Sequence, residues 1–273
     1  MDSLGDRMKG YEKLTDTKLL PRTPIGIRID GKNFHSFTKK MKFEKPFDEM
    51  MTARMAATTL GLCKFAQDCL IGYTQSDEIT LILAPEATID SQAWFGRRVQ
   101  KLCSLLAAKA SVIFNNSFYY EKVAEVRPEP IFDCRVFALP NMVEAYNCLV
   151  WRQNDCVKNS ISSACYYDLG KKVGRGTARK LVHGKNQKEQ QEALFQKAGI
   201  NWNDYPPKWK RGVACVRGMK IVTGPPDENG DVDCTVRRPW VIKEEIPRFT
   251  SPEGKDWLGR LFGIVWEENE RAG

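Results

Sequence analysis

Apolar and polar positions alternate in several short segments of the chain, which is the pattern expected of half-buried β-strands. The first segment runs from residue 24 to residue 30, where isoleucines alternate with small or basic residues. Residues 79–83 are strongly β-prone, and with the polar stretch before them they predict a hairpin over residues 65–83. A further strand is predicted over residues 131–139. Together these runs indicate a central sheet.

Other segments have helical spacing or helical composition. They are residues 4–18, 46–64, 92–115, 141–167, 188–198 and 256–266. Ser91 is the predicted N-cap of the third helix, and Asn141 with Glu144 gives the fourth a capping-box-like start. Arg97, Arg98 and Lys101 are expected on neighbouring positions of the third helix, with Arg97 as a solvated neighbour of Arg98.

The order strand, helix, two hairpin strands, helix, strand is the ferredoxin-like βαββαβ arrangement, so we expect an α+β fold. Polymerase palms and nucleotidyl cyclases share this order. We therefore predict a polymerase-palm-like catalytic core over residues 1–140. Residues 141–273 are the predicted C-terminal extension of helices and strands, packed on the same domain and serving RNA binding or oligomerisation. Its strands are expected at 210–222 and 235–242, with a turn at 225–231.

Acidic residues stand at the ends of two predicted strands. Asp30 closes the first strand, and Asp77 and Glu78 lie at or near the turn of the hairpin. Carboxylate oxygens suit Mg²⁺, and two such ions can stabilise the attacking and leaving oxygens of an in-line phosphoryl transfer. An aspartate before a glycine is also common in ordinary turns. The segment 31–37 that follows is polar and turn-like, and its backbone N–H groups could cradle phosphate oxygens.

Composition limits the class of protein. The chain has 273 residues, and its 42% apolar content can fill a sizeable core. It has no run of 18 apolar residues and no signal-like N-terminus, so we expect no membrane span and a cytoplasmic location. Nine cysteines without a CxxC pair favour reduced thiols in the core. The presence of only two histidines argues against a Ser-His or Cys-His hydrolase and against a zinc catalyst.

A basic stretch of the sequence indicates a polyanionic partner. The formal charge is +8 and the pI about 9.0. Seven basic residues and no acidic residue lie between positions 171 and 188; they are Lys171, Lys172, Arg175, Arg179, Lys180, Lys185 and Lys188. A solvated surface is the ordinary explanation for such a run. The missing carboxylates and the interleaved glycines favour contact with RNA phosphates.

Short motifs in a fixed order resemble those of the tRNA-His guanylyltransferase superfamily. They are residues 28–37, 45–48, 75–78, 94–98, 132–135, 151–155, 176–177, 200–203 and 210–212, so the resemblance covers roughly residues 5 to 220. It implies an enzyme with a polymerase-like palm that adds nucleotides in the 3′→5′ direction to RNA 5′ ends, usually as a homotetramer.

The resemblance also implies roles for individual residues. The Asp30 and Asp77 carboxylates and the Gly31 carbonyl would hold two Mg²⁺ ions, and Glu78 is the family's adjacent, supporting acid among the catalytic residues. The triphosphate of the nucleotide would contact Lys32, Asn33, Phe34, His35, Lys45, Asp48, Ser76 and Asn159. Activation of the 5′ end and a second triphosphate are linked to Arg98, Lys101 and Arg135. Lys and Arg would neutralise developing charge.

One segment departs from the family pattern. Where the eukaryotic tRNA-His enzymes read His-Ile-Asn-Asn-Leu-Tyr-Asn, this chain has Val-Lys-Asn-Ser-Ile-Ser-Ser at residues 157–163. This resembles the guanylyltransferase-like branch, which implies template-directed repair of 5′-truncated tRNA, with ATP adenylylating a monophosphate end and GTP or other nucleoside triphosphates as substrates. The alternatives are a strict tRNA-His guanylyltransferase, a nucleotidyl cyclase and an inactive RNA-binding palm.

Overall fold

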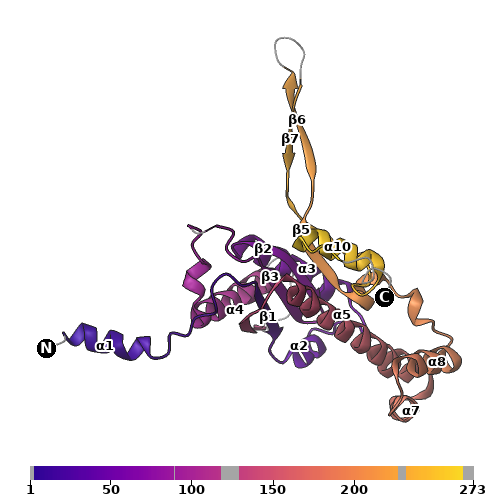
Figure 1. Ribbon diagram of the computed structural model, residues 1–273. Helices are drawn as coiled ribbons and strands as arrows, with labels where there is room; N and C mark the ends of the chain where they lie inside the picture. Colours follow the sequence, from indigo (N-terminus) through magenta and orange to yellow (C-terminus); the bar gives the residue numbers. More distant parts are fainter. Residues whose placement is uncertain (1–2, 89, 118–128, 227–231, 267–273) are drawn as a thin grey trace.

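A six-stranded antiparallel sheet forms the centre of the molecule, in the order β4-β1-β3-β2-β5-β8. The computed structural model describes residues 3–88, 90–117, 129–226 and 232–266 (Figure 1). The strands of this sheet are β1 Ile25–Gly31, β2 Cys69–Gln75, β3 Glu78–Leu83, β4 Phe132–Ala138, β5 Val213–Arg217 and β8 Trp240–Lys243. The mixed architecture of helices and antiparallel sheet agrees with the α+β prediction. The order β4-β1-β3-β2 is the predicted split βαβ order.

The strand register brings the acidic residues together at one end of the central strands. Asp30, the penultimate residue of β1, lies opposite Glu78 of β3 and opposite Asp133 of β4. Asp77 occupies the turn between β2 and β3, and its carbonyl oxygen accepts a hydrogen bond of 3.0 Å from the Gly31 amide. The end of β1 and the hairpin turn are therefore held side by side by backbone hydrogen bonds.

Helices α3 Glu49–Phe65 and α4 Val99–Asn116 pack on one face of the sheet (Figure 1). The β1 isoleucines are fully or almost fully buried there, together with Leu62 and Leu106. Alternation along β1 thus sends its apolar side chains to this face and leaves its charged side chains on the other face.

Helix α5 Met142–Ala164 and helix α10 Pro252–Phe262 cover the opposite face. Gln153 of α5 is buried, donates to the Pro247 carbonyl at 3.0 Å and accepts from the Phe249 amide at 2.6 Å. Beyond α5 the chain continues through a π-helical turn, Cys165–Leu169, into the basic stretch. The helices of this extension are α6 Gly170–Val173, α7 Arg175–Val182 and α8 Gln187–Ala198, which form a third small core.

Two elements project from this body (Figure 1). They are helix α1 Leu4–Lys13, in which no residue is buried, and the two-stranded ribbon of β6 Lys220–Pro226 and β7 Val232–Arg237. The strand predicted over 210–222 is divided: the short helix α9 Pro207–Arg211 ends at Gly212, which has φ of +80°, β5 follows in the main sheet, and β6 begins the ribbon at Lys220. The strand predicted over 235–242 is likewise divided between β7 and β8. The predicted turn at 225–231 falls largely outside the described residues.

Three further predictions are wrong in their boundaries. The segment 31–37 is turn-like only as far as Asn33, since helix α2 begins at Phe34 and runs to Lys40. Packing explains this helix, because Phe34 and Phe37 both lie against Phe114 of α4. The helix predicted from residue 92 begins at Val99, and the N-terminal helix ends at Lys13.

Arg97 is buried rather than solvated. It lies before α4, at the end of a 3₁₀ turn Trp94–Arg97 with left-handed backbone angles, so Arg97, Arg98 and Lys101 do not share one helix face. Its side chain is 3% exposed and forms two hydrogen bonds of 2.6 Å to the Glu86 carboxylate. It also donates to the carbonyls of Leu20 and Thr23. These bonds hold the pKa of Glu86 at about 2, below its ordinary 4.5.

Among the described ranges, no helix is long and apolar enough to cross a lipid bilayer. Five of the nine cysteines are buried, which agrees with the predicted core role of most of them, whereas Cys234 is exposed.

Arg97→Met should lower the free energy of unfolding by about 3–5 kcal/mol, because it leaves the Glu86 carboxylate buried without its partner. Denaturant unfolding at neutral pH measures this loss. Arg260→Met is the matched control, since it breaks an ion pair with Asp256 between exposed side chains and should hardly move the unfolding midpoint.

The same pair predicts a pH dependence. Since the folded pKa of Glu86 is depressed, its stabilisation is present above pH 4.5 and is lost as the pH falls towards 2. Glu86→Gln should therefore be less stable than the wild type at pH 7 and should lose less stability over that acid range. Parallel stability curves for the two proteins would contradict this assignment.

Candidate functional site

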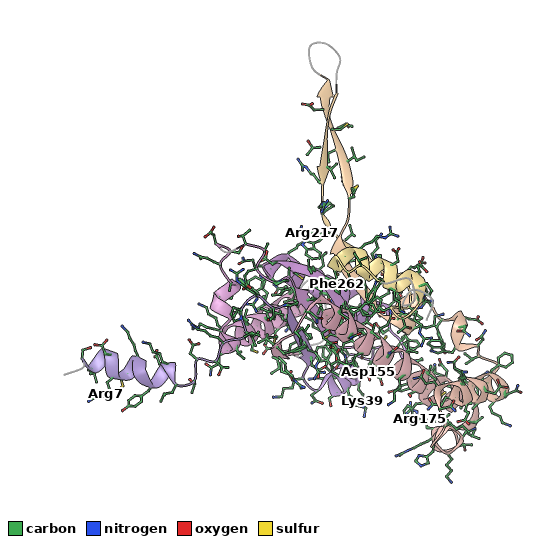
Figure 2. All side chains as sticks on the ribbon, in the orientation of Figure 1. Arg7, Lys39, Asp155, Arg175, Arg217 and Phe262 are labelled. Atoms are coloured by element: carbon green, nitrogen blue, oxygen red, sulfur yellow. The ribbon has the colours of Figure 1, made fainter. Side chains whose placement is uncertain are left out.

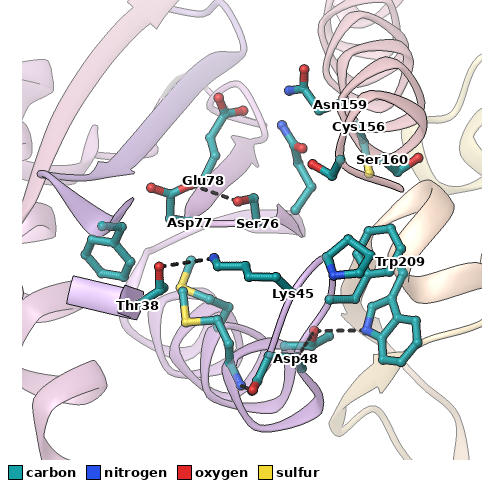
Figure 3. A pocket seen from close by; sticks show the side chains of 18 of the residues that line it. Thr38, Lys45, Asp48, Ser76, Asp77, Glu78, Cys156, Asn159, Ser160 and Trp209 are labelled. Carbon is teal, nitrogen blue, oxygen red and sulfur yellow. Dashed lines mark hydrogen bonds between the residues drawn. The ribbon is translucent and has the colours of Figure 1, made fainter. Parts of the chain in front are cut away.

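A pocket of about 630 Å³ opens where β1 and the β2–β3 hairpin end (Figure 3). Its walls come from α2, the segment leading into α3, the hairpin turn, and the C-terminal half of α5 with the π-helical turn after it. Most of the predicted nucleotide and metal residues line it: Asp30, Phe34, His35, Lys45, Asp48, Ser76, Asp77, Glu78 and Asn159. Residues from three separate parts of the chain thus meet in one cavity.

Asp30 and Asp77 form the acidic floor of this pocket. Burial raises the pKa of Asp30, and the negative charges of Asp77 and Asp133 raise it further. Burial also raises the pKa of Asp77, although the hydrogen bond from the Ser76 hydroxyl, 3.0 Å from Asp77 Oδ1, lowers it in part. A divalent cation bound here would relieve the repulsion that Asp77 and Asp133 exert on the Asp30 carboxylate.

The donor set fits Mg²⁺ better than a metal held entirely by protein. Within the described residues, no group of three His, Cys, Asp or Glu side chains is arranged as a metal site. Asp30, Asp77 and the Gly31 carbonyl supply only oxygen donors. Mg²⁺ usually binds through one or two carboxylates and completes its shell with water and substrate phosphates. The residues present are therefore compatible with a cation that binds together with a nucleotide.

Lys45 supplies the positive charge of the pocket. Its ammonium group donates to the Thr38 hydroxyl at 3.1 Å (Figure 3). Burial lowers the pKa of Lys45, and the charges of Asp77 and Asp48 oppose that shift. A half-buried ammonium that lines a cavity near carboxylates is suited to a phosphate group.

Asp48 has a structural role that the sequence motif did not indicate. It is the N-cap of α3, where its Oδ1 accepts from the Met51 amide at 2.7 Å and its Oδ2 accepts from the Glu44 amide at 2.8 Å. Both carboxylate oxygens therefore order the segment that carries Lys45. Whether Asp48 also contacts a nucleotide stays a prediction.

Only some backbone amides of the loop after β1 are free to bind a phosphate. The Lys32 amide donates a hydrogen bond of 2.9 Å to the Ile131 carbonyl, so it is not free to bind a phosphate. Asn33 has a left-handed backbone with φ of 57° and precedes α2. The first N–H groups of a helix have no acceptor within it, which leaves the Phe34 and His35 amides able to meet phosphate oxygens. The Phe34 ring lies in the core against Phe132.

A buried ion network links the hairpin to α5, and its central residue was not among the predicted site residues. Arg152 donates to Glu78 at 2.6 Å and to Asp155 at 2.7 Å, and Asp155 accepts from Asn159 at 3.1 Å. The Arg152 side chain is 6% exposed. Burial raises the pKa of Glu78 while Arg152 lowers it. Arg152 stands in the motif at 151–155, but only the contacts show that it positions Glu78 and, through Asp155, Asn159.

The three residues predicted for 5′-end activation do not lie together within this chain. Arg98 forms an ion pair with Asp16 at 3.1 Å, and Lys101 lies over the Phe95 ring, both at the start of α4. That end of the sheet, where β1 begins, is about 20 Å of strand away from Asp30. Arg135 lies on β4 opposite Arg28. A shared role for the three stays a prediction.

The basic stretch begins at the rim of the pocket. Lys171 donates to the Lys45 carbonyl at 3.2 Å and pairs with Asp168 at 2.8 Å. Arg175, labelled in Figure 2, lies over the rings of Tyr166 and Tyr167, which line the pocket. Lys172, Arg179, Lys180 and Lys185 are exposed on α6, α7 and the turn that follows. A cationic surface therefore leads from the extension to the pocket.

Comparisons with known proteins point to one family. A family model described as tRNAHis guanylyltransferase matches residues 5–140, and one described as Thg1 C terminal domain matches residues 143–240. The tRNA(His) guanylyltransferase of Saccharomyces cerevisiae is 33% identical over 221 residues, which covers 78% of this chain and 91% of that protein. The match of the C-terminal model extends beyond residue 220, where the recognisable sequence motifs end.

Two solved structures resemble nearly the whole chain. A bacterial tRNA(His) guanylyltransferase-like protein in complex with ATP matches with a TM-score of 0.75 and 30% identity, and covers 96% of this chain and 99% of its own. A bacterial protein of the same description in complex with GTP matches with a TM-score of 0.69 and 29% identity, and the coverage of both chains is the same.

The ion network predicts strong energetic coupling between β3 and α5. Arg152→Met should destabilise the protein by about 3–5 kcal/mol, because it leaves Glu78 and Asp155 without their cation. Glu78→Gln keeps an oxygen that can accept from Arg152 and should cost less. The double variant Arg152→Met/Glu78→Gln should lose clearly less free energy of unfolding than the two single losses added together. Additive losses in denaturant unfolding would show that Arg152 does not act through Glu78.

Proposed function

The chain belongs to the tRNA-His guanylyltransferase superfamily and is a nucleotidyltransferase, and we propose that it extends the 5′ ends of tRNA in the 3′→5′ direction under the control of a template base. The observation that carries this proposal is the meeting of Asp30, Asp77 and Lys45 in one pocket. Addition of nucleotides to tRNA 5′ ends is the activity of the family. Direction, template control and dependence on metal ions are our proposals.

We propose that the pocket binds a nucleoside triphosphate. The related bacterial structures contain ATP and GTP, and the walls of this pocket carry groups suited to phosphates. Lys45 and the first amides of α2 would contact the phosphates, Ser76 would orient Asp77, and Asn159 would be held by Asp155. Each of these groups is fixed by a hydrogen bond or by a helix terminus, so little ordering is needed when a nucleotide binds.

Asp30, Asp77 and the Gly31 carbonyl would hold Mg²⁺. When bound, two such ions would neutralise the phosphates and favour ionisation of the attacking hydroxyl. The chain's own contribution is to keep both carboxylates in place, through the β1–β3 register and the Gly31 amide, and to hold Lys45 beside them. Glu78 would support this arrangement through its ion pair with Arg152.

The proposed reaction has two steps when the RNA ends in a monophosphate. ATP first transfers its adenylyl group to the 5′-phosphate of the RNA, and pyrophosphate leaves from the ATP. The 3′-hydroxyl of the incoming nucleotide then attacks that phosphate and AMP departs. A triphosphate end needs no activation, because pyrophosphate can leave directly.

The altered segment at 157–163 favours template-directed repair over a strict tRNA-His enzyme. Val157 and Ile161 pack into the core of the helical extension, and the Ser160 hydroxyl accepts from the Trp202 indole at 3.2 Å. Side chains used in this packing are poorly placed to read a tRNA-specific feature. The structural match over 96% of the chain is to a guanylyltransferase-like protein. The strict enzyme remains the alternative and predicts addition of G alone, to one tRNA.

We propose that residues 1–140 carry catalysis on a polymerase-like palm and that residues 141–273 bind RNA through the exposed cations of α6 and α7. The two family models divide the chain at nearly the same point. The projecting α1 and β6–β7 ribbon expose apolar side chains, including Leu4, Tyr11, Ile221 and Val236. Such surfaces support the proposed homotetramer.

Simple assays distinguish the other two candidate functions from the proposed one. A nucleotidyl cyclase would make a cyclic product from ATP or GTP alone and would not need the basic stretch. An inactive RNA-binding protein would bind tRNA in a salt-dependent way without incorporation. The joint presence of the carboxylate pair and Lys45 in one cavity argues against the inactive protein.

Purified protein with Mg²⁺ and all four nucleoside triphosphates should extend a 5′-triphosphorylated tRNA that lacks its first nucleotide. The added base should follow the opposing base when that base is varied, because pairing selects the nucleotide. Asp77→Asn should abolish incorporation and leave the fold intact. Addition of G alone, and only to tRNA-His, would establish the strict enzyme instead.

Mn²⁺ binding should depend on the same carboxylates. Electron paramagnetic resonance with a nucleoside triphosphate present should detect bound Mn²⁺ in the wild type and much less in Asp30→Asn. Asp133→Asn is the matched control, because Asp133 lies opposite Asp30 but outside the pocket. Equal binding by all three proteins would contradict the proposed metal site.

A further inference from the structure

The segment that carries Lys45 is held by the C-terminal extension. Residues 45–47 line the pocket, and Figure 3 shows the Lys45 side chain within it. The Lys45 carbonyl accepts a hydrogen bond of 3.2 Å from the Lys171 ammonium. The Phe47 ring meets the Tyr205 ring edge-on, with ring centres 5.1 Å apart. Lys171 and Tyr205 both follow α5 in the chain, and neither is among the described residues that line the pocket.

One carboxylate holds both of these contacts. Asp168 accepts a hydrogen bond of 2.8 Å from Lys171 through Oδ1 and one of 2.5 Å from the Tyr205 hydroxyl through Oδ2. The Asp168 side chain is 14% exposed, whereas that of Lys171 is 66% exposed. Fixing an exposed lysine costs much rotamer entropy, so its contact with the Lys45 carbonyl depends on a second, well-placed partner. Burial raises the pKa of Tyr205, and the hydrogen bond to Asp168 raises it further, so the hydroxyl remains a donor.

Asp168 lies in the π-helical turn Cys165–Leu169. Such turns are rare and occur mostly at functional sites. Tyr166 and Tyr167 of this turn line the pocket. Asp168 is the single acidic residue between positions 156 and 188, a stretch rich in cations. Its two partners are the residues that contact the segment 45–47, so its charge serves the nucleotide site rather than the cationic surface.

We propose that Asp168 is a positioning residue of the nucleotide site, which holds the Lys45 ammonium in place for the phosphates of a nucleoside triphosphate. This inference rests on the proposed function, because it requires the pocket to bind a nucleotide. Asp168 acts through Lys171 on the Lys45 backbone and through Tyr205 on the Phe47 ring, and it touches no substrate itself. Without the carboxylate the same pocket groups remain, but the segment has more freedom to lose when a nucleotide binds.

Nucleotide affinity tests this inference without RNA. The full-length protein with Mg²⁺ is titrated with GTP by calorimetry, up to millimolar concentrations so that weak binding is also measured. Asp168→Ala should raise the GTP dissociation constant by about 5- to 50-fold, within the range for groups that share one hydrogen-bond network. Asp168→Asn keeps one acceptor oxygen and should have a smaller effect. Tyr205→Phe and Lys171→Met each remove one of the two contacts and should each give part of the loss.

A double-variant cycle separates positioning from folding. Lys45→Met removes the ammonium itself. If Asp168 acts through Lys45, Asp168→Ala should weaken GTP binding little further in the Lys45→Met background. A merely structural role would weaken binding by the same factor in both backgrounds. Lys197→Met is the matched control, since it removes an exposed cation from α8 of the same extension and should leave the GTP dissociation constant unchanged. Thermal unfolding of each variant verifies that the fold is retained.

The outcomes distinguish this inference from the proposed function. GTP binding that is unchanged in Asp168→Ala, or an equal factor of loss in both backgrounds, would overturn the positioning role. If the wild type bound GTP but extended no RNA, the proposed function would fail, and the comparison of variants would still decide the role of Asp168. A wild type that did not bind GTP would overturn both.

Discussion

The ion pair between Arg152 and Glu78 joins the two parts of the molecule on which the site depends. Glu78 begins β3 directly after the hairpin turn, and Arg152 lies in the middle of α5. An unpaired charge in that interior would cost several kcal/mol, so the helix can pack on the sheet only in a position that satisfies both groups. This constraint sets α5 against the hairpin, and through Asp155 it places Asn159 at the wall of the pocket.

The second constraint is the central position of β1 in the sheet. Because β1 pairs with β3 on one side and β4 on the other, Asp30 has a cavity towards the hairpin and an open surface towards β4. The helical extension adds cations at the rim of the cavity and leaves the β4 side open. The proposed nucleotide and metal sites therefore depend on this strand order.

Much of the candidate site was predictable, because its residues lie in short motifs at strand ends. Asp30, Asp77, Lys45 and Asn159 all line one pocket, as the resemblance implied. Roles that depend on contacts across the fold were not predictable. The capping bonds of Asp48, the use of the Lys32 amide by Ile131 and the separation of Arg98 from Arg135 are results of packing and register. No local spacing encodes them, because each partner comes from a distant segment.

The sequence by itself determined the order of helices and strands in the core, the acidic strand ends and the family. Alternation of period two, capping residues and ordered motifs are local signals. They can be recognised without knowing which distant segments pack against them. Only the tertiary structure decided that Arg97 is buried against Glu86, that residues 34–40 are helical and that Trp151 stands exposed beside two arginines. Burial and charge pairing depend on residues far apart in the chain, and folding alone brings those residues together.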